Sequence, residues 1–134
     1  MKSGLLRKLF LTAALAVPML GGAVAAQADE ERFVFVSHAP DSDSWWNVIK
    51  NALKDAAKDF GVKVEYRNPS TGDLADMARI VEQATAQKPA GIIVTIADYN
   101  VLEKPVKAAS AKGIPVITVN SGTAEESKKL GALM

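Results

Sequence analysis

The chain has 134 residues, no cysteine and one histidine, with 16 Lys and Arg against 15 Asp and Glu. This length allows a core for one small domain, and the lack of cysteine excludes a disulfide framework and makes a zinc site a poor fit. The nearly balanced charge gives no attraction for nucleic acid or for an anionic membrane.

Residues 1–28 have the pattern of a secretory signal peptide. Three basic residues come first, at Lys2, Arg7 and Lys8. An apolar run from Leu9 to Leu20 follows, and Ala26-Gln27-Ala28 provides an A-x-A site for cleavage after Ala28. A transmembrane anchor is the alternative, but the run is shorter than the roughly 20 residues that a span needs. No cysteine follows it, which excludes a lipoprotein.

Cleavage after Ala28 would leave 13 basic against 15 acidic residues, a net charge of −2. We therefore expect a periplasmic protein that is not inserted in the membrane once the signal is removed. Residues 29–134 are expected to form the folded domain.

Four apolar runs, beginning at Phe33, Val62, Gly91 and Ile114, alternate with helical patterns. Their spacing predicts an α/β fold, with an open parallel sheet and helical crossovers on both faces. The run at Val62 alternates apolar and polar residues, which indicates an edge strand. The run at Gly91 is apolar almost throughout, as expected of a strand covered on both faces.

The first helix is predicted over residues 44–60, with Gly61 ending it. Its expected buried stripe is Trp45, Ile49, Ala52, Leu53, Ala56 and Phe60. Asp73 should cap the second helix. In the third helix Pro105 is awkward, so we expect a short turn at 99–103 and then the main helix, with Pro105 in its first turn.

Residues 123–134 end in an apolar run that resembles a further strand cut short, so we expect the chain to be a fragment. The sheet should then have a fifth position beyond the fourth strand. If the strands take the flavodoxin-like order 2-1-3-4(-5), the loops after the first and third strands face each other at the carboxyl edge, where α/β sheets bind ligands.

Those loops suit a neutral, polyhydroxylated ligand, because they carry carboxylates, hydroxyls and indoles. The candidate residues are Asp41, Asp43, Trp45, Trp46 and Asp98, with Asn120 after the fourth strand. An indole can lie against the C–H face of a sugar, and an amide can bond two adjacent hydroxyls. Each has a plain alternative: Asp43 and Asp98 as helix caps, one tryptophan as core, and Asn120 as a strand end.

Other chemistries fit less well. The loop after the first strand lacks glycine, which excludes a dinucleotide or Walker phosphate loop, and no G-x-S-x-G elbow is present. Three carboxylates, Asp41, Asp43 and Asp98, could in principle hold Mg²⁺ in a small flavodoxin-like enzyme, although an export signal argues against that reading. We expect no cofactor, no metal site and no enzymatic activity.

Val34-Phe35-Val36-Ser37, the Trp45-Trp46 pair, Gly91-Ile92-Ile93-Val94 and the run from Gly113 to Thr118 together resemble the amino-terminal half of a type I periplasmic sugar-binding protein, in the ribose- and autoinducer-2-binding branch. This resemblance covers nearly all of residues 29–134. It implies the first lobe of a two-lobe solute-binding subunit of an ABC importer, monomeric when full length, that meets a transporter permease.

The resemblance places an aromatic pair against the sugar, here Trp45 and Trp46, and a polar residue before the pair, here Asp43. The family commonly has Asp then Arg after the fourth strand, where this chain has Asn120 and Ser121, which puts a ribose-like ligand in doubt. The predicted ligand-binding residues are Ser37, Asp43, Trp45, Trp46, Asp98 and Asn120. A periplasmic domain that reports a sugar or signal molecule to a receptor is the alternative function.

Overall fold

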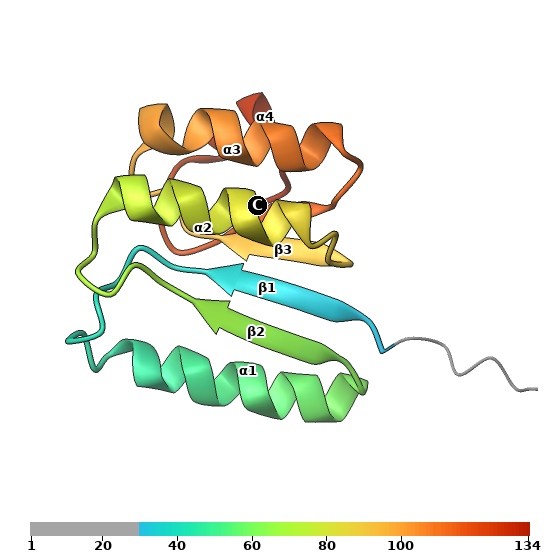
Figure 1. Ribbon diagram of the computed structural model, residues 1–134. Helices are drawn as coiled ribbons and strands as arrows, with labels where there is room; N and C mark the ends of the chain where they lie inside the picture. Colours follow the sequence, from blue (N-terminus) through green and yellow to red (C-terminus); the bar gives the residue numbers. More distant parts are fainter. Residues whose placement is uncertain (1–29) are drawn as a thin grey trace, which may run out of the picture.

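The computed structural model describes residues 30–134, and the predicted signal peptide lies outside the described residues. Strands and helices alternate along the chain, as the sequence predicts (Figure 1). The elements are β1 (Arg32–Val36), α1 (Trp46–Phe60), β2 (Lys63–Arg67), α2 (Leu74–Ala86), β3 (Gly91–Val94), α3 (Tyr99–Ala111), β4 (Val116–Thr118) and α4 (Ala124–Lys129).

The strands form one parallel sheet in the order β2-β1-β3-β4, which confirms the predicted order and the edge position of β2. β1 lies in the middle, where Phe35 is level with Tyr66 of β2 and with Ile93 of β3. Because every strand runs the same way, all the loops that follow strands emerge at one edge of the sheet. We call this edge the rim.

Helices pack on both faces of the sheet, but unequally (Figure 1). α2 and α3 lie side by side on one face, over a core that contains Val34, Val36 and Met77. α1 lies on the other face, over a smaller cluster built on Phe35 and Trp46. Successive residues of β1 point to opposite faces, so this one strand contributes to both cores.

Gly61 ends α1, as predicted, with a left-handed backbone (φ 63°). The predicted buried stripe is right at Ile49, Leu53 and Ala56, which are partly buried, but wrong at Ala52 and at both ends. Trp46 is buried, whereas Trp45 is 56% exposed and Phe60 78% exposed. The reason is that Phe35 and Tyr66 present aromatic rings to Trp46, so the start of the helix turns that indole inward.

α3 is one continuous helix, so the predicted division around Pro105 is wrong. Pro105 lies inside it and is buried. A proline there removes one backbone hydrogen bond, but its ring adds apolar contact on the buried side of the helix. The predicted cap of α2 is confirmed, since the Asp73 carboxylate accepts from the backbone N–H of Asp76 at 2.8 Å.

The sequence analysis missed α4. Thr123 and Glu126 form a capping box at its start, in which each side chain accepts from the other residue's backbone N–H. The T-x-x-E pattern could have identified it. After α4, Leu133 makes a parallel bridge with Ile117 of β4. This bridge lies on the side of β4 that faces away from β3, where the fifth position of the sheet is predicted.

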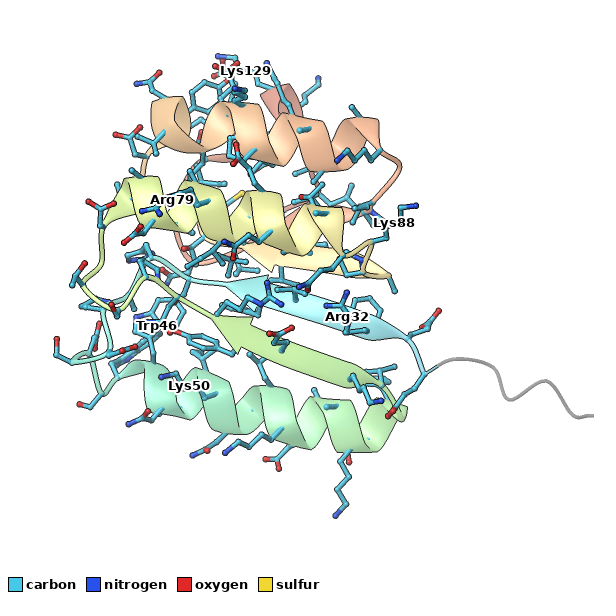
Figure 2. All side chains as sticks on the ribbon, in the orientation of Figure 1. Arg32, Trp46, Lys50, Arg79, Lys88 and Lys129 are labelled. Carbon is cyan, nitrogen blue, oxygen red and sulfur yellow. The ribbon has the colours of Figure 1, made fainter. Side chains whose placement is uncertain are left out.

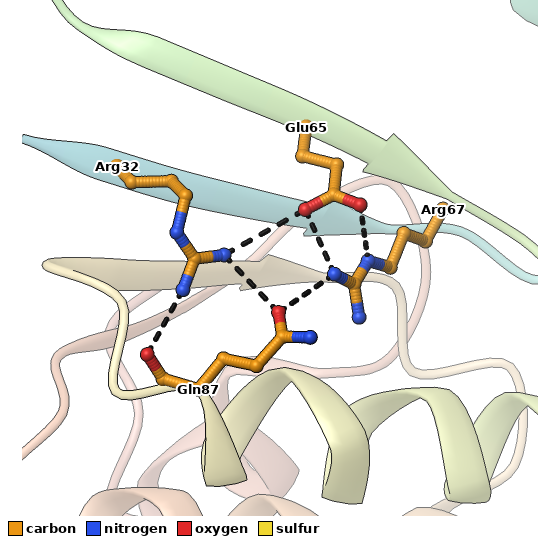
Figure 3. Close-up of polar contacts among 4 residues, drawn as sticks. All are labelled: Arg32, Glu65, Arg67 and Gln87. Atoms are coloured by element: carbon orange, nitrogen blue, oxygen red, sulfur yellow. Dashed lines mark hydrogen bonds and ion pairs between the residues drawn. The ribbon is translucent and has the colours of Figure 1, made fainter.

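A charged cluster joins β1, β2 and the end of α2 (Figure 3). Arg67 makes two hydrogen bonds to the Glu65 carboxylate, at 2.7 and 2.8 Å, and Arg32 approaches the same carboxylate at 3.6 Å. Both arginines also donate to Gln87. This polar network lies on the α2 side of the edge strand, whereas Tyr66 packs against Phe35 and Trp46 on the α1 side.

We predict that Glu65→Gln lowers the free energy of unfolding by about 0.5 kcal/mol at neutral pH, since the ion pairs are partly exposed. The hydrogen bonds from Arg67 hold the pKa of Glu65 below its ordinary value of 4.5, against a smaller opposing effect of burial. A lowered pKa stabilises the fold above the ordinary value, and this contribution is lost as the pH falls through the folded-state pKa.

Urea unfolding at neutral pH and well below pH 4.5 measures this effect. The difference between the wild type and Glu65→Gln should disappear in acid. The matched control is Glu82→Gln, on the exposed side of α2. This variant should not change the urea concentration at the midpoint of unfolding at either pH. An equal loss in both variants, or a loss that persists in acid, contradicts the assignment.

Candidate functional site

Hydrogen bonds tie the loops of the rim to one another. The Asn68 side chain, after β2, donates to the Ala39 carbonyl and to the Asp41 carboxylate, both at 2.9 Å. The backbone of Asp41 also donates to the carbonyl of Ser70 at 2.9 Å. These bonds join the loop after β1 to the loop after β2.

The loops after β1, β3 and β4 are joined in the same way. The backbone N–H of His38 donates to the Thr95 hydroxyl at 3.1 Å, and the His38 ring lies 2.9 Å from the same oxygen through Nδ1. Ile96 donates to the carbonyl of Ser121. Gly122, at φ 91°, packs so closely on Ile96 that a Cβ there would lie 2.8 Å from that side chain. The rim is therefore one connected surface.

Trp46 is the anchor of the aromatic part of the rim. Its ring meets Phe35, Tyr66 and His38 with centroids 5.6–6.4 Å apart, and only 4% of the residue is exposed. Figure 2 shows Trp46 between the start of α1 and the sheet. This indole belongs to the core beneath the rim.

The Trp45 ring packs against the ring of Trp46. Its ring is nearly perpendicular to Trp46, at 80° and a centroid distance of 5.2 Å, and the residue is 56% exposed. An exposed aromatic residue does not gain the free energy that removal of its apolar area from water would provide. An indole in this position can offer a flat apolar face to a ligand.

Three carboxylates lie in the rim loops. Asp43 accepts from the backbone N–H of Trp45 at 3.1 Å, and so fixes the turn that precedes α1. Asp98 is the cap of α3 and accepts from Val101 at 3.1 Å. Asp41 accepts from Asn68. Each of these bonds uses one carboxylate oxygen, so each side chain retains further capacity to accept hydrogen bonds.

The remaining two predicted residues differ in access. Ser37 is fully buried, and its hydroxyl bonds the Tyr66 hydroxyl at 2.5 Å and accepts from the Ala39 backbone at 3.3 Å. Asn120 is exposed at the end of β4, in the left-handed region at φ 66°. The structure joins Asp43 to the tryptophan pair, whereas no hydrogen bond or ring contact recorded for residues 30–134 joins Asp98 or Asn120 to that pair.

Sequence reasoning missed the polar support beneath the rim, which consists of Thr95 and Tyr66. Both side chains are at the carboxyl ends of strands, and the polar ends of otherwise apolar runs were the available signal. Burial raises the pKa of Tyr66, against the lowering effect of the Ser37 hydrogen bond. The phenol therefore stays neutral and supports the loop as a hydrogen-bonding group.

Within residues 30–134, no group of three His, Cys, Asp or Glu side chains is arranged to hold a metal ion. The predicted alternative of a magnesium site at Asp41, Asp43 and Asp98 is thus not supported by the geometry. In the same part of the chain, no helix is both long and apolar enough to cross a membrane.

The family model described as "Periplasmic binding protein domain" matches residues 33–132. The chain is 30% identical over 108 residues to the ABC transporter periplasmic-binding protein YphF of Escherichia coli (strain K12), an alignment that covers 80% of this chain and 33% of YphF.

Two solved structures are also similar. A carbohydrate transporter from Acidothermus cellulolyticus 11B, in complex with myo-inositol, has 32% identity and a TM-score of 0.73, and the match covers 78% of this chain and 36% of that one. GanP, a glucose-galactose binding protein from Geobacillus stearothermophilus, has 29% identity and a TM-score of 0.66, with coverage of 71% and 34%. The chain thus spans about a third of the length of these relatives.

The different burial of the two indoles gives a prediction. Trp46→Ala should lower the free energy of unfolding by about 3–5 kcal/mol, because it removes the ring that fills the core beneath the rim. Trp45→Ala should change it by less than about 0.5 kcal/mol, since most of that ring is in water. Urea unfolding followed by far-UV circular dichroism measures both, and equal losses would contradict the assigned roles.

Proposed function

Because the chain belongs to the periplasmic binding protein domain family, we propose that residues 29–134 form the amino-terminal lobe of the solute-binding component of a sugar ABC importer. The proposed ligand is a neutral sugar or polyol, captured in the periplasm after cleavage behind Ala28. Family membership places such proteins with binding and transport, and we assign no catalytic residue and no cofactor.

The observation that carries the proposal is the exposed Trp45 indole, fixed on the buried Trp46. A sugar ring has an apolar C–H face and a polar edge, and it binds best where a flat aromatic face lies beside hydrogen-bond acceptors. Asp43 stands next to this indole in the same loop. The aromatic face and the carboxylate together match the two kinds of surface on a sugar.

The charge of the rim favours a neutral ligand. Asp41, Asp43 and Asp98 are acidic, and Asn120 adds an uncharged amide. Carboxylates accept hydrogen bonds from sugar hydroxyls but repel phosphates and sugar acids. The ligands that the names of three similar structures state are myo-inositol, glucose and galactose, and arabinose, which are all neutral and polyhydroxylated.

The roles of the individual residues follow from their access. Trp45, Asp43, Asp98 and Asn120 are proposed to touch the ligand, whereas Trp46 and Ser37 are proposed to support the loop from beneath. This chain supplies one wall of a site. Since ligand sites bury most of the ligand surface, we expect this lobe alone to bind the sugar weakly and the full-length protein to bind it more tightly. We also propose that the full-length protein is a monomer and that it binds a transporter permease.

Nuclear magnetic resonance tests this proposal directly, because the chain has two tryptophans and hence two indole N–H signals. In the mature chain that begins at Asp29, titration with myo-inositol, glucose, galactose and arabinose should shift the Trp45 signal with saturation. The Trp46 signal should move little. If the chemical shift of the Trp45 indole N–H does not change with any of these sugars up to their solubility limits, the proposal is contradicted.

The matched variants are Trp45→Ala and Val48→Ala, since both residues are exposed near the start of α1. Trp45→Ala should weaken binding by about tenfold, a factor that corresponds to about 1.4 kcal/mol, within the range of aromatic contacts. Val48→Ala should leave the affinity unchanged. An equal loss in both variants would indicate a general effect on α1 rather than contact with the sugar.

A further inference from the structure

Hydrogen bonds fix the first residues of the loop after β1. The backbone N–H of Ser37 donates to the carbonyl of Arg67 at 3.0 Å, and the backbone N–H of Ala39 donates to the Ser37 hydroxyl at 3.3 Å. Between these two residues, the backbone N–H of His38 donates to the Thr95 hydroxyl at 3.1 Å. Because all three N–H groups are paired, the backbone from which the His38 side chain projects is in place before a ligand binds.

The Thr95 hydroxyl also decides which nitrogen of the His38 ring carries the proton. Thr95 is fully buried, and its oxygen lies 2.9 Å from Nδ1 of the ring. A buried hydroxyl that cannot donate its proton is destabilising. Within residues 30–134, Nδ1 is the one acceptor recorded for this hydroxyl, because the backbone N–H of His38 is a donor. Thr95 therefore donates to Nδ1, and the neutral ring carries its proton on Nε2.

The Nε2 atom of His38 has no hydrogen-bond partner among the described residues. The ring is bonded there through Nδ1, and the buried side-chain polar atom recorded without a partner is the hydroxyl oxygen of Ser121. Nε2 is therefore accessible, although His38 as a whole is partly buried. The two nitrogens of an imidazole point in different directions, so Nε2 points away from Thr95. The ring thus offers an N–H donor from a fixed position.

This donor lies beside the exposed indole of the rim. The His38 ring meets Trp46 edge to face, at 85° and a centroid distance of 5.6 Å. Trp45 packs against the same buried indole at 5.2 Å. The two rings therefore border one support, from which Trp45 offers an apolar face and His38 offers an N–H group.

A neutral donor complements the acidic side chains of the rim. The carboxylates of Asp41, Asp43 and Asp98 can only accept hydrogen bonds when ionised. A sugar hydroxyl that donates to a carboxylate still has lone pairs, which are satisfied only by a donor. The loops 38–46, 97–100 and 120–123 contain no Lys or Arg. A neutral imidazole supplies an N–H in this setting without the positive charge that would attract anionic ligands.

We propose that His38 is a specificity-determining residue of the sugar site, whose Nε2–H donates to an oxygen of the bound sugar or polyol. Thr95 is the positioning residue, which fixes the ring and its tautomer. A ligand without an oxygen at this point leaves the N–H unpaired in a site closed to water, and so binds more weakly. The contact with the ligand rests on the proposed function, whereas the tautomer is a property of the free chain.

Nitrogen-15 nuclear magnetic resonance tests the tautomer without overlap, because the chain has one histidine. In the mature chain that begins at Asp29, at a pH above the range in which histidine ordinarily titrates, Nε2 should be protonated and Nδ1 unprotonated. Thr95→Ser keeps the hydroxyl and should keep this tautomer, whereas Thr95→Val should give a mixture of both. A proton on Nδ1 in the wild type overturns the assignment.

Titration of the same sample with myo-inositol tests the contact. The Nε2 signal of His38 and the indole N–H signal of Trp45 should shift over the same range of concentration. If the Trp45 signal shifts with saturation and the Nε2 signal does not, the contact is overturned and the proposed function stands. If neither signal shifts with any of the four sugars tested above, the proposed function fails, and this contact fails with it.

Two substitutions separate the two nitrogens of the ring. In His38→Asn, the amide oxygen can take the place of Nδ1 as acceptor for Thr95, but no donor reaches the position of Nε2. In His38→Gln, the longer side chain brings an amide N–H to that position. His38→Asn should weaken the binding of myo-inositol about fivefold, as expected for one neutral hydrogen bond, whereas His38→Gln should weaken it less than about twofold.

Urea unfolding of both variants shows whether each is folded under the conditions of the titration. Affinity of the folded His38→Asn variant equal to that of the wild type overturns the proposal. An equal loss in the two folded variants also overturns it, because the loss would then come from the packing of the imidazole against Trp46 rather than from the donated hydrogen bond.

Discussion

The arrangement of this molecule depends on the central position of β1. Its backbone is hydrogen-bonded to β2 on one side and to β3 on the other, in parallel and with Phe35 in line with Tyr66 and Ile93. Because parallel strands end at one edge, this pairing gathers loops that are far apart in sequence. Since β1 alternates Val34 and Val36 with Phe35, the same five residues also anchor the helices on both faces.

The aromatic cluster at the end of β1 connects that pairing to the site. Phe35 stacks on Tyr66 with centroids 5.7 Å apart, and both contact Trp46. Trp46 in turn supports Trp45. An exposed indole on a flexible loop would lose rotamer freedom on meeting a ligand, and support by a buried ring reduces that cost before binding. The core and the candidate site are thus parts of one packing arrangement.

The strands and their order could be predicted from the sequence, because apolar runs at regular spacing leave few arrangements for a parallel sheet. Which of the two indoles at the start of α1 is buried could not be predicted, although Ile49 and Leu53 do lie on the packed side. Apolar residues occupy a wide arc of this helix, so its sequence does not decide which indole is buried. Trp46 is buried because it packs against Phe35 and Tyr66, which are distant from it in sequence. The continuity of α3 through Pro105 was not predicted, because the sequence shows the hydrogen bond that a proline removes but not the buried apolar contacts of its ring, which offset that loss. The gathering of the candidate loops followed from topology, but the buried place of Ser37 required coordinates.

The central claim is that the rim around Trp45 is a sugar-binding surface built on the end of β1. A crystal structure of the mature chain, grown or soaked with myo-inositol, tests it most directly. We expect the ring of the polyol against the exposed face of Trp45, with a hydroxyl bonded to Asp43. A polyol bound elsewhere on the ordered chain, with the Trp45 face bare and accessible, would contradict the account.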